Sequence, residues 1–400
     1  MKQDFDDGTP GSGGRAPALR SVHLVWATIA LLASLVPAAH AQGMATGPGG
    51  PAPGWSLVLR ATQGYQSNVR FTTQRPQDDF VTRLGAGLGY VGTGPKGQFG
   101  INLGTEGLIY TRLADLNRIN GTLGISGTRI LGPATRLTVA ERGSLRYTDE
   151  IDDLSEPGVL LPFTLSFRNR STLGLEHRIG TRTQVGLGVL HELARFRDNE
   201  VSDGSRWGPS LTIGRQIGVD SRVGVAGIFM RSVRGDVTAD VAQGNAEFQT
   251  LLSRRLSASV SGGLSRLWSQ GRSRTNPVAG AGLAYTFRRG VLSLNYRHAV
   301  RQVFGLGSER VIDSVELAYS HQLSRTVSGV VGGFWGEHRD IFDPSLDQNA
   351  QNVRAGLNWQ VRPQLALNAN YSLRRREGTA GVAVVGHRAA VGVTWAFQWR

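Results

Sequence analysis

The chain has 400 residues with no cysteine, 54 glycines and a net charge of +14, from 44 lysines and arginines against 30 aspartates and glutamates. Its hydrophobic fraction of 40% lies below the roughly 45–50% usual for globular domains, so a conventional apolar core is thinly supplied. The lack of cysteine excludes a disulfide framework and the acylated cysteine of a lipoprotein anchor.

The first 41 residues predict a secretory signal peptide. Arg15 and Arg20 precede an uncharged run that closes on Ala39-His40-Ala41, an A-x-A cleavage pattern in which Ala39 and Ala41 are the small residues. The apolar run 24–36 is shorter than the roughly 20 residues of a membrane-spanning helix, which makes an uncleaved anchor the less favoured alternative. Residues 42–53 are rich in glycine and proline and are interpreted as a periplasmic linker.

From residue 54 to residue 400 the repeated pattern is an alternation of apolar and polar residues. The segment 365–376, "LALNANYSLRRR", is typical: leucine, alanine and tyrosine fall on one face, and asparagine, serine and arginine on the other. No 11-residue window has convincing helical periodicity. Short turns are predicted at 93–97, 132–135, 180–182, 219–221, 253–255, 288–290, 324–326 and 361–363. Longer loops are predicted at 68–78, 113–117, 150–166, 198–205, 236–243, 271–276, 306–310, 341–350 and 378–381.

These seventeen connections predict 18 strands, with 16 as the alternative. The strands are about 12 to 16 residues long, more than the five or six usual in a soluble sandwich. Their polar faces carry residues too small or too charged to fill a core. The pattern therefore predicts an all-β protein: a closed antiparallel transmembrane barrel in the outer membrane of a Gram-negative bacterium, with short periplasmic turns and longer extracellular loops. A barrel of this size encloses an aqueous channel.

The last ten residues, "VGVTWAFQWR", alternate in the same way and predict the closing strand. Its apolar positions would face lipid, and the strand would pair with the first strand at 55–66. Such an ending is similar to the C-terminal signal that the barrel-assembly machinery reads, although Arg400 follows the last aromatic residue. The expected signal residues are Val391, Val393, Trp395, Phe397 and Trp399.

The polar strand faces predict a basic channel lining. After the signal the positive charge is almost all arginine, since Lys96 is the one lysine there. The expected pore-lining residues are Arg83, Arg118, Arg136, Arg142, Arg146, Arg168, Arg170, Arg178, Arg222, Arg297, Arg301, Arg354, Arg374 and Arg376. The acids expected beside them are Glu106, Glu176, Glu192 and Glu316. A surplus of like charge in a narrow channel concentrates counter-ions and predicts anion preference. Pairing with the glutamates, or solvation at strand ends, is the alternative for about half of these arginines.

Two residues conflict with this register, because Glu141 and His298 would face lipid. A charged side chain at the bilayer midplane costs about 2–4 kcal/mol. Either both residues lie near the interface or the register slips there.

The loop 150–166 contains an apolar stretch, and we expect it either to constrict the lumen or to pack on the rim. Acidic clusters at Asp149, Asp152, Asp153 and Glu156 and at Asp340, Asp343 and Asp347 could bridge divalent cations to lipopolysaccharide, with ordinary solvated loops as the favoured interpretation.

No catalytic motif or metal-ligand spacing is present, so we expect no enzyme, no cofactor and no metal. The cations lack aromatic interleaving, which argues against nucleic acid.

The first hairpin supports a more specific expectation. Tyr65 and Ser67-Asn68-Val69 are followed by Asp78-Asp79-Phe80-Val81-Thr82-Arg83-Leu84 and a glycine-rich strand ending in Tyr90. This layout resembles the outer-membrane β-barrel porins associated with exopolysaccharide biosynthesis clusters. The resemblance implies a channel that exports an anionic exopolysaccharide beside a separate periplasmic polysaccharide-export protein.

Two other functions stay open. One is a general or anion-selective diffusion porin for small anions, and the other is a structural or adhesive surface barrel. The expected partners are outer-membrane lipid, lipopolysaccharide, the barrel-assembly machinery, and either an anionic polysaccharide or small anions.

Overall fold

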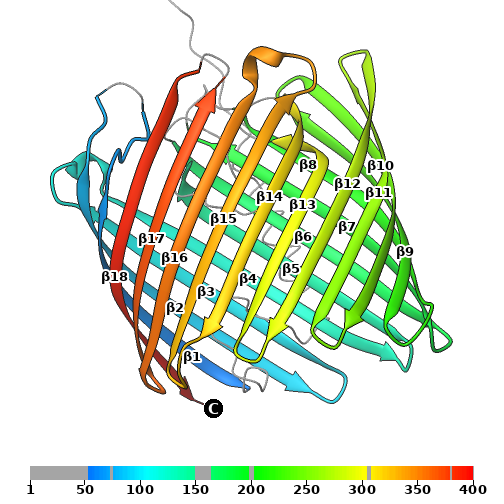
Figure 1. Cartoon of the computed structure of the whole chain (residues 1–400), viewed down its shortest axis with the longest axis horizontal. Coiled ribbons are helices and arrows are strands. Elements are labelled where there is room, and N and C mark those ends of the chain that lie inside the picture. The colour runs from blue at the N-terminus through cyan, green and yellow to red at the C-terminus, as the bar shows by residue number, and fades with distance from the viewer. Residues whose placement is uncertain are drawn as a thin grey trace, which may run out of the picture.

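The computed structural model describes residues 53–72, 75–148, 164–197, 202–303, 308–378 and 381–399. These residues form one closed 18-stranded antiparallel sheet (Figure 1), in which each strand pairs with the next along the chain and β1 pairs with β18. The first nine strands are β1 (Gly54–Gln66), β2 (Asp79–Gly94), β3 (Gly97–Tyr110), β4 (Arg118–Gly132), β5 (Thr135–Tyr147), β6 (Leu165–Ile179), β7 (Thr183–Phe196), β8 (Gly204–Gln216) and β9 (Ser221–Arg234). The other nine are β10 (Val237–Ser253), β11 (Leu256–Ser269), β12 (Arg272–Phe287), β13 (Gly290–Val303), β14 (Ser308–Gln322), β15 (Val327–Asp340), β16 (Gln348–Arg362), β17 (Leu365–Gly378) and β18 (Ala383–Trp399).

Closure of the sheet confirms the predicted strand number and the predicted partner of the last strand. β18 pairs with β1 from Trp55↔Trp399 to Gln66↔Arg388 without a register shift. The alternative of 16 strands is wrong. Because the first and last strands pair, the sheet is closed at that junction.

The two faces of the barrel wall differ in chemistry as the alternation predicts. Large apolar side chains on one face stay exposed, for example Leu84 at 51%, Leu187 at 54% and Leu264 at 61%. Register places glycine, serine, threonine, asparagine and arginine on the other face, which is the inner one. An apolar outer band around a polar interior is the arrangement of a transmembrane barrel.

Aromatic rings border this apolar band at both ends. On the turn side, Trp55 lies against Tyr90 with ring centroids 4.9 Å apart, and on the loop side Tyr65 lies against Phe80 at 5.5 Å. Tyr65 lies ten positions after Trp55 along β1. At about 3.3 Å per residue and a tilt of about 40°, that separation is roughly 25 Å, the height of the apolar band in such barrels.

The connections confirm the predicted short turns and correct two predicted loops. Residues 237–243 and 272–276 are strand, because β9 and β10 are joined by residues 235–236 alone and β11 and β12 by residues 270–271 alone. Gly235 (φ +53°) allows the first tight turn, while Gln270 (φ +49°) and Gly271 (φ +73°) both adopt the left-handed conformation of a two-residue hairpin turn. β14 likewise begins at Ser308, inside the predicted loop 306–310.

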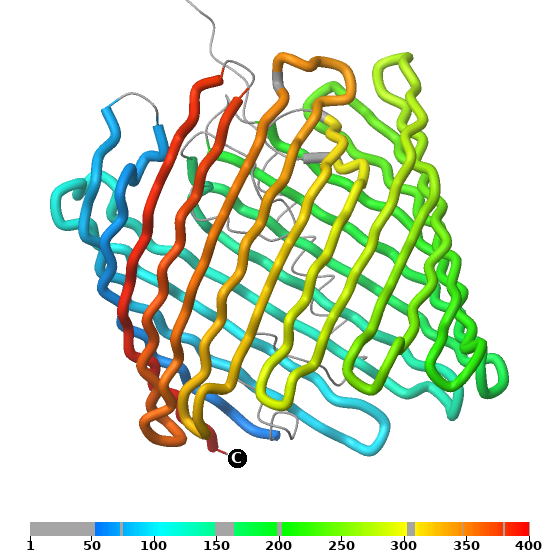
Figure 2. Tube along the Cα trace, viewed as in Figure 1, coloured from blue at the N-terminus to red at the C-terminus, as the bar shows by residue number. Residues whose placement is uncertain are grey.

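The barrel wall opens between β12 and β13 on the loop side. Pairing of these strands runs from Phe287↔Gly290 to Ala279↔His298 and stops there, so in the described part of the chain residues 272–278 of β12 pair with β11 alone. Pro277 lies just beyond the last pair, and a proline has no N–H to donate, which suits a sheet edge. Figures 1 and 2 show the upper parts of the two strands diverging.

Above this split, the β13–β14 hairpin folds into the interior. Val300 of β13 and Ile341, which follows β15, are buried in one cluster with Ala239 and Val241 of β10 and Leu267 of β11. Arg234 at the end of β9 forms an ion pair with Glu309 of β14, and both side chains are less than 5% exposed. Four strands separate β9 from β14 along the wall, so this pair joins them across the interior.

A second set of loop segments folds over the inner side of β2 and β3. Val69 and Leu116, from the two loops, pack with Val81, Leu108 and Tyr110 of the strands. Leu116 belongs to a short 3-10 turn, η1 (Ala114–Leu116), and a second such turn, η3 (Pro344–Leu346), follows β15. The described residues include no helix long and apolar enough to cross a membrane.

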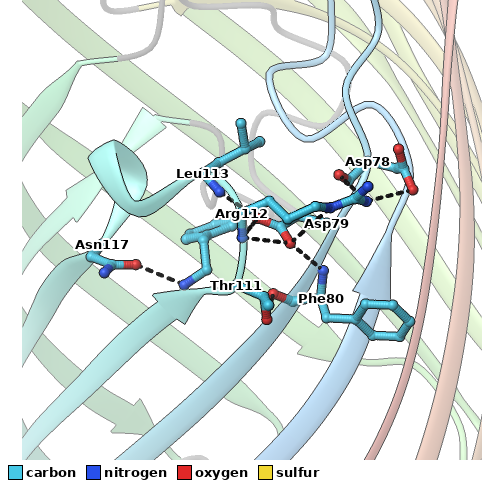
Figure 3. A network of polar contacts seen from close by, with 8 residues as sticks. Asp78, Asp79, Phe80, Thr111, Arg112, Leu113 and Asn117 are labelled. Carbon is cyan, nitrogen blue, oxygen red and sulfur yellow. Dashed lines mark hydrogen bonds and ion pairs between the residues drawn. The ribbon is translucent and has the colours of Figure 1, made fainter.

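Asp79 fixes the loop that follows β3 at the loop-side rim of the barrel (Figure 3). Its fully buried carboxylate accepts hydrogen bonds from the backbone N–H groups of Phe80 (2.7 Å), Arg112 (2.9 Å) and Leu113 (2.8 Å). The Arg112 side chain donates to the Asp78 carboxylate at 2.8 Å, and this hydrogen bond holds the pKa of Asp78 below its ordinary value.

Several predictions lie outside the described residues. These are the signal peptide with its cleavage residues Ala39 and Ala41, the linker up to residue 52, and residues 150–163 of the loop expected to constrict the lumen. The acids Asp149, Asp152, Asp153 and Glu156 lie there too.

Candidate functional site: a basic channel interior

Register places all fourteen predicted arginines on the inner face of the wall. The assignment follows from the pairings that put them opposite the apolar band: Arg83 on β2, Arg118 on β4, Arg136, Arg142 and Arg146 on β5, Arg168, Arg170 and Arg178 on β6, Arg222 on β9, Arg297 and Arg301 on β13, Arg354 on β16, and Arg374 and Arg376 on β17. Whether these side chains line a conducting pore remains a prediction.

Three of the inner arginines lie in one row with a carboxylate on neighbouring strands. Arg142 lies opposite Arg170, Arg170 opposite Glu192, and Glu192 opposite Arg206, so the four residues form one row across β5 to β8. Glu192 is 8% exposed, accepts from Arg170 at 2.8 Å and pairs with Arg206 through its other oxygen. One negative charge thus lies between two of the three guanidinium groups, and the row as a whole is positive.

The other predicted glutamates also lie on the inner face, each beside an arginine. The nitrogen–oxygen distances are 3.7 Å for Arg83–Glu106, 3.5 Å for Arg136–Glu176 and 3.1 Å for Arg354–Glu316. These contacts neutralise part of the arginine charge. Arg146, Arg178, Arg222 and Arg297, by contrast, have no carboxylate partner among the described residues.

Aromatic rings hold other inner arginines in place. The Arg118 guanidinium lies between the rings of Tyr110 and Tyr147, at 5.2 Å and 5.1 Å from their centroids, and is buried. Arg376 lies 5.1 Å from the ring of Phe71, which comes from the loop after β1. Such contacts fix an arginine without cancelling its charge.

Seven further arginines on the inner face were missed by sequence reasoning: Arg60, Arg206, Arg234, Arg272, Arg274, Arg310 and Arg388. Arg60 and Arg388 follow the same alternation as the others and could have been found from it. Arg272, Arg274 and Arg310 lie in segments that read as loops. The seven inner-face carboxylates of the described strands are Asp79, Glu106, Glu176, Glu192, Glu247, Glu316 and Asp340. With Glu309 of the infolded hairpin added, the inner arginines still outnumber the carboxylates of the interior more than twofold.

Glu141 and His298 do lie on the outer face, and the register does not slip at either. Each has a polar partner there. Asn169 donates a hydrogen bond to the Glu141 carboxylate. His298 Nδ1 lies 2.7 Å from the Asp313 carboxylate, which also accepts from Tyr296 at 3.0 Å and from Arg339.

The acids Asp340, Asp343 and Asp347 stabilise the turn after β15. Asp347 accepts from the backbone N–H of Asp340 at 2.8 Å. Asp343 accepts from the hydroxyl of Ser345 at 2.6 Å and from its backbone N–H at 3.0 Å, and these two hydrogen bonds lower the pKa of Asp343. Among the described residues, no group of three or more His, Cys, Asp or Glu side chains is arranged to hold a metal ion.

A concave pocket of about 380 Å³ opens on the inner wall beneath the infolded hairpin. β10 and β11 contribute Glu247, Ser259 and Ser261, and β12 contributes Gly280 and Gly282. β13 to β15 complete it with Asn295, Arg297, Arg301, Ile312, Ser314, Glu316 and Phe334. The pocket combines charges of both signs with hydroxyl groups and one apolar side.

The fold is that of the outer-membrane porins: a closed antiparallel barrel of 18 strands with a polar interior. No protein-family model matches the chain, and no curated protein matches its sequence. Among solved structures, Pseudomonas aeruginosa OccK2 (OpdF) matches with a TM-score of 0.50 and 12% identity over 87% of this chain and 98% of that one. OccK2 in complex with glucuronate gives a TM-score of 0.49 at the same identity and coverage. Acinetobacter baumannii OccAB3 gives 0.47, with 11% identity over 86% and 99% of the two chains.

Proposed function

We propose that this protein is an outer-membrane channel through which small anions diffuse. The observation that carries the proposal is the inner-face surplus of arginine, including Arg146, Arg178, Arg222 and Arg297, which have no carboxylate partner among the described residues. Fixed charges of one sign on a low-dielectric wall raise the local concentration of counter-ions. The outer apolar band with its two aromatic borders supports placement in a lipid bilayer.

Export of an exopolysaccharide was the first expectation from the sequence, and it now has less support. The ion pair Arg234–Glu309 and the cluster around Leu267 occupy the interior on the loop side, where a polymer would have to pass. The segment that carries the resemblance also has a structural role here, because Asp79 fixes the rim loops. No match to a known protein supports the exopolysaccharide association.

Uptake into liposomes separates the two functions. We expect liposomes containing the protein to take up glucuronate faster than glucose, which has a similar size and similar hydroxyl groups, and to exclude dextran. Equal rates for the two monomers would contradict anion diffusion. Passage of dextran, or loss of surface polysaccharide on deletion of the gene, would instead support polysaccharide export.

A matched pair of variants tests the inner-face assignment. Arg142→Gln with Arg170→Gln removes two inner charges, whereas Arg215→Gln removes a charge that register places on the outer face of β8. We expect the inner variant to reduce the preference for glucuronate and the outer variant to leave it unchanged.

A further inference from the structure

The pocket on the inner wall contains two opposite charges without a partner. Glu106, Glu176, Glu192 and Glu316 each contact an arginine, but Glu247 has no ion pair among the described residues, and neither has Arg297. Both side chains are exposed to the channel interior. A carboxylate and a guanidinium that face the same pocket without contacting each other leave room for a ligand between them.

The sheet register fixes how the two charges are arranged. Glu247 lies opposite Ser261, Ser261 opposite Gly280, and Gly280 opposite Arg297. The four residues form one row across β10 to β13, with Glu247 at one end and Arg297 at the other. Three strand spacings of about 4.8 Å put their backbones roughly 14 Å apart. Both side chains line the same pocket, so a molecule that bridges them must carry its two charges several bonds apart.

The floor between the two charges consists of small and hydrogen-bonding residues. Ser261 and Gly280 lie in the same row, and Ser259, Gly282 and Asn295 form the next row. The glycines leave the wall without side chains at the centre, while the serines and asparagine offer hydrogen bonds. Ile312 and Phe334 supply an apolar side that suits a methylene chain.

The second carboxylate of the pocket differs from Glu247 in its contacts. Glu316 accepts from Arg354 at 3.1 Å, so its charge is already compensated within the wall. Glu247 is therefore the carboxylate of this pocket with charge to offer a cation, and Arg297 has its positive charge available for an anion.

We propose that this pocket binds small zwitterions that carry a carboxylate and an ammonium group at opposite ends of a short chain, with the carboxylate on Arg297 and the ammonium on Glu247. The inference rests on the proposed channel function and adds zwitterions to the small anions as a second class of solute, which this pocket binds. A simple anion gains the contact with Arg297 alone, whereas a zwitterion of matching length gains both contacts.

Calorimetric titration of the purified full-length protein in detergent tests the proposal without requiring conductance. The probes are 6-aminohexanoate and hexanoate, which have the same carboxylate and chain length, and glycine, whose charges are too close to bridge the pocket. We expect 6-aminohexanoate to bind roughly tenfold more tightly than hexanoate, the value of one charge-assisted hydrogen bond, and glycine to bind no better than hexanoate.

Three variants locate the site. Glu247→Gln should abolish the preference for 6-aminohexanoate and leave hexanoate binding unchanged, and Arg297→Gln should weaken both. Glu106→Gln, a carboxylate on β3 that is paired with Arg83, is the control and should change neither. Equal binding of the two acids by the unaltered protein, no binding of either, or an unchanged ratio in Glu247→Gln would overturn the proposal. Failure of the channel function would show separately, as lack of anion selectivity in membranes with this binding ratio intact.

Discussion

Single residues set both the charge of the interior and the shape of its rim. The Glu192 carboxylate is buried between the guanidinium groups of Arg170 and Arg206, and Arg142 lies in the same row. This carboxylate offsets part of the positive charge on the inner face of β5 to β8.

We therefore expect Glu192→Gln to increase anion selectivity, because the amide keeps the hydrogen-bonding shape but removes the negative charge. The measurement is the reversal potential in a planar bilayer under a salt gradient. Glu337→Gln is the matched control, since register places Glu337 on the outer face of β15. A selectivity change of the same size in both variants would contradict the assignment of faces.

Asp79→Ala should loosen the rim, because it leaves the N–H groups of Phe80, Arg112 and Leu113 without their acceptor. Loss of a buried acceptor costs about 1–3 kcal/mol. The measurements are the urea midpoint for folding in detergent and the rate of proteolysis within residues 111–117. Asp115→Ala, which removes one exposed ion pair with Arg70, should cost less than about 1 kcal/mol.

At the scale of strands, the sequence predicts the strands and their two faces correctly in the part of the barrel wall that contacts lipid. There one face must be apolar, so the alternation is strong and the strand number, the turn-side connections and the faces of the arginines could all be read from it. In the upper part of β10, Ala239 and Val241 face inward and are buried in the interior cluster, while Asp240 lies on the outer face and pairs with Arg231. The apolar side is therefore the inner one there, the reverse of the lipid-facing part of the wall, which is why 236–243 read as a loop.

The infolded β13–β14 hairpin could not have been predicted from local pattern. It depends on contacts between Glu309 and Arg234, and between Val300 and Leu267, which are far apart in the sequence. The sequence offers one local hint, since Pro277 suits a sheet edge.

We expect Arg234→Gln combined with Glu309→Gln to enlarge the channel, because the pair links the infolded hairpin to β9 across the interior. Single-channel conductance should rise or fluctuate more than in the unaltered protein. The control is Arg231→Gln with Asp240→Asn, an ion pair that register places on the outer face. Unchanged conductance in the first variant would show that the hairpin does not limit the passage.

The last strand should be required for assembly, because β18 pairs on both sides and closes the sheet. Deletion of residues 391–400 would expose the edges of β1 and β17 in lipid, where unpaired backbone groups are costly. We expect this deletion to abolish the heat-modifiable folded band on gel electrophoresis, and deletion of Arg400 alone to preserve it. A folded band without residues 391–400 would contradict the role assigned to them.

At the scale of the whole molecule, closure of the sheet separates an apolar outside from a basic, water-accessible inside. The fold could be predicted from the alternation and the even strand number, and the basic character of the lining from the arginines on the polar faces. The substrate class could not be predicted from the sequence, because only the register of four strands shows that Glu247 and Arg297 lie in the same row. Distinguishing paired from unpaired charges likewise requires the side-chain contacts.

The sign of the reversal potential tests the central claim most directly. The full-length protein is inserted into a planar bilayer with tenfold different KCl concentrations on its two sides. A surplus of fixed arginine charge on the inner wall predicts a reversal potential shifted toward the equilibrium potential of chloride. A value near zero, or one shifted toward the equilibrium potential of potassium, would contradict an anion-selecting interior.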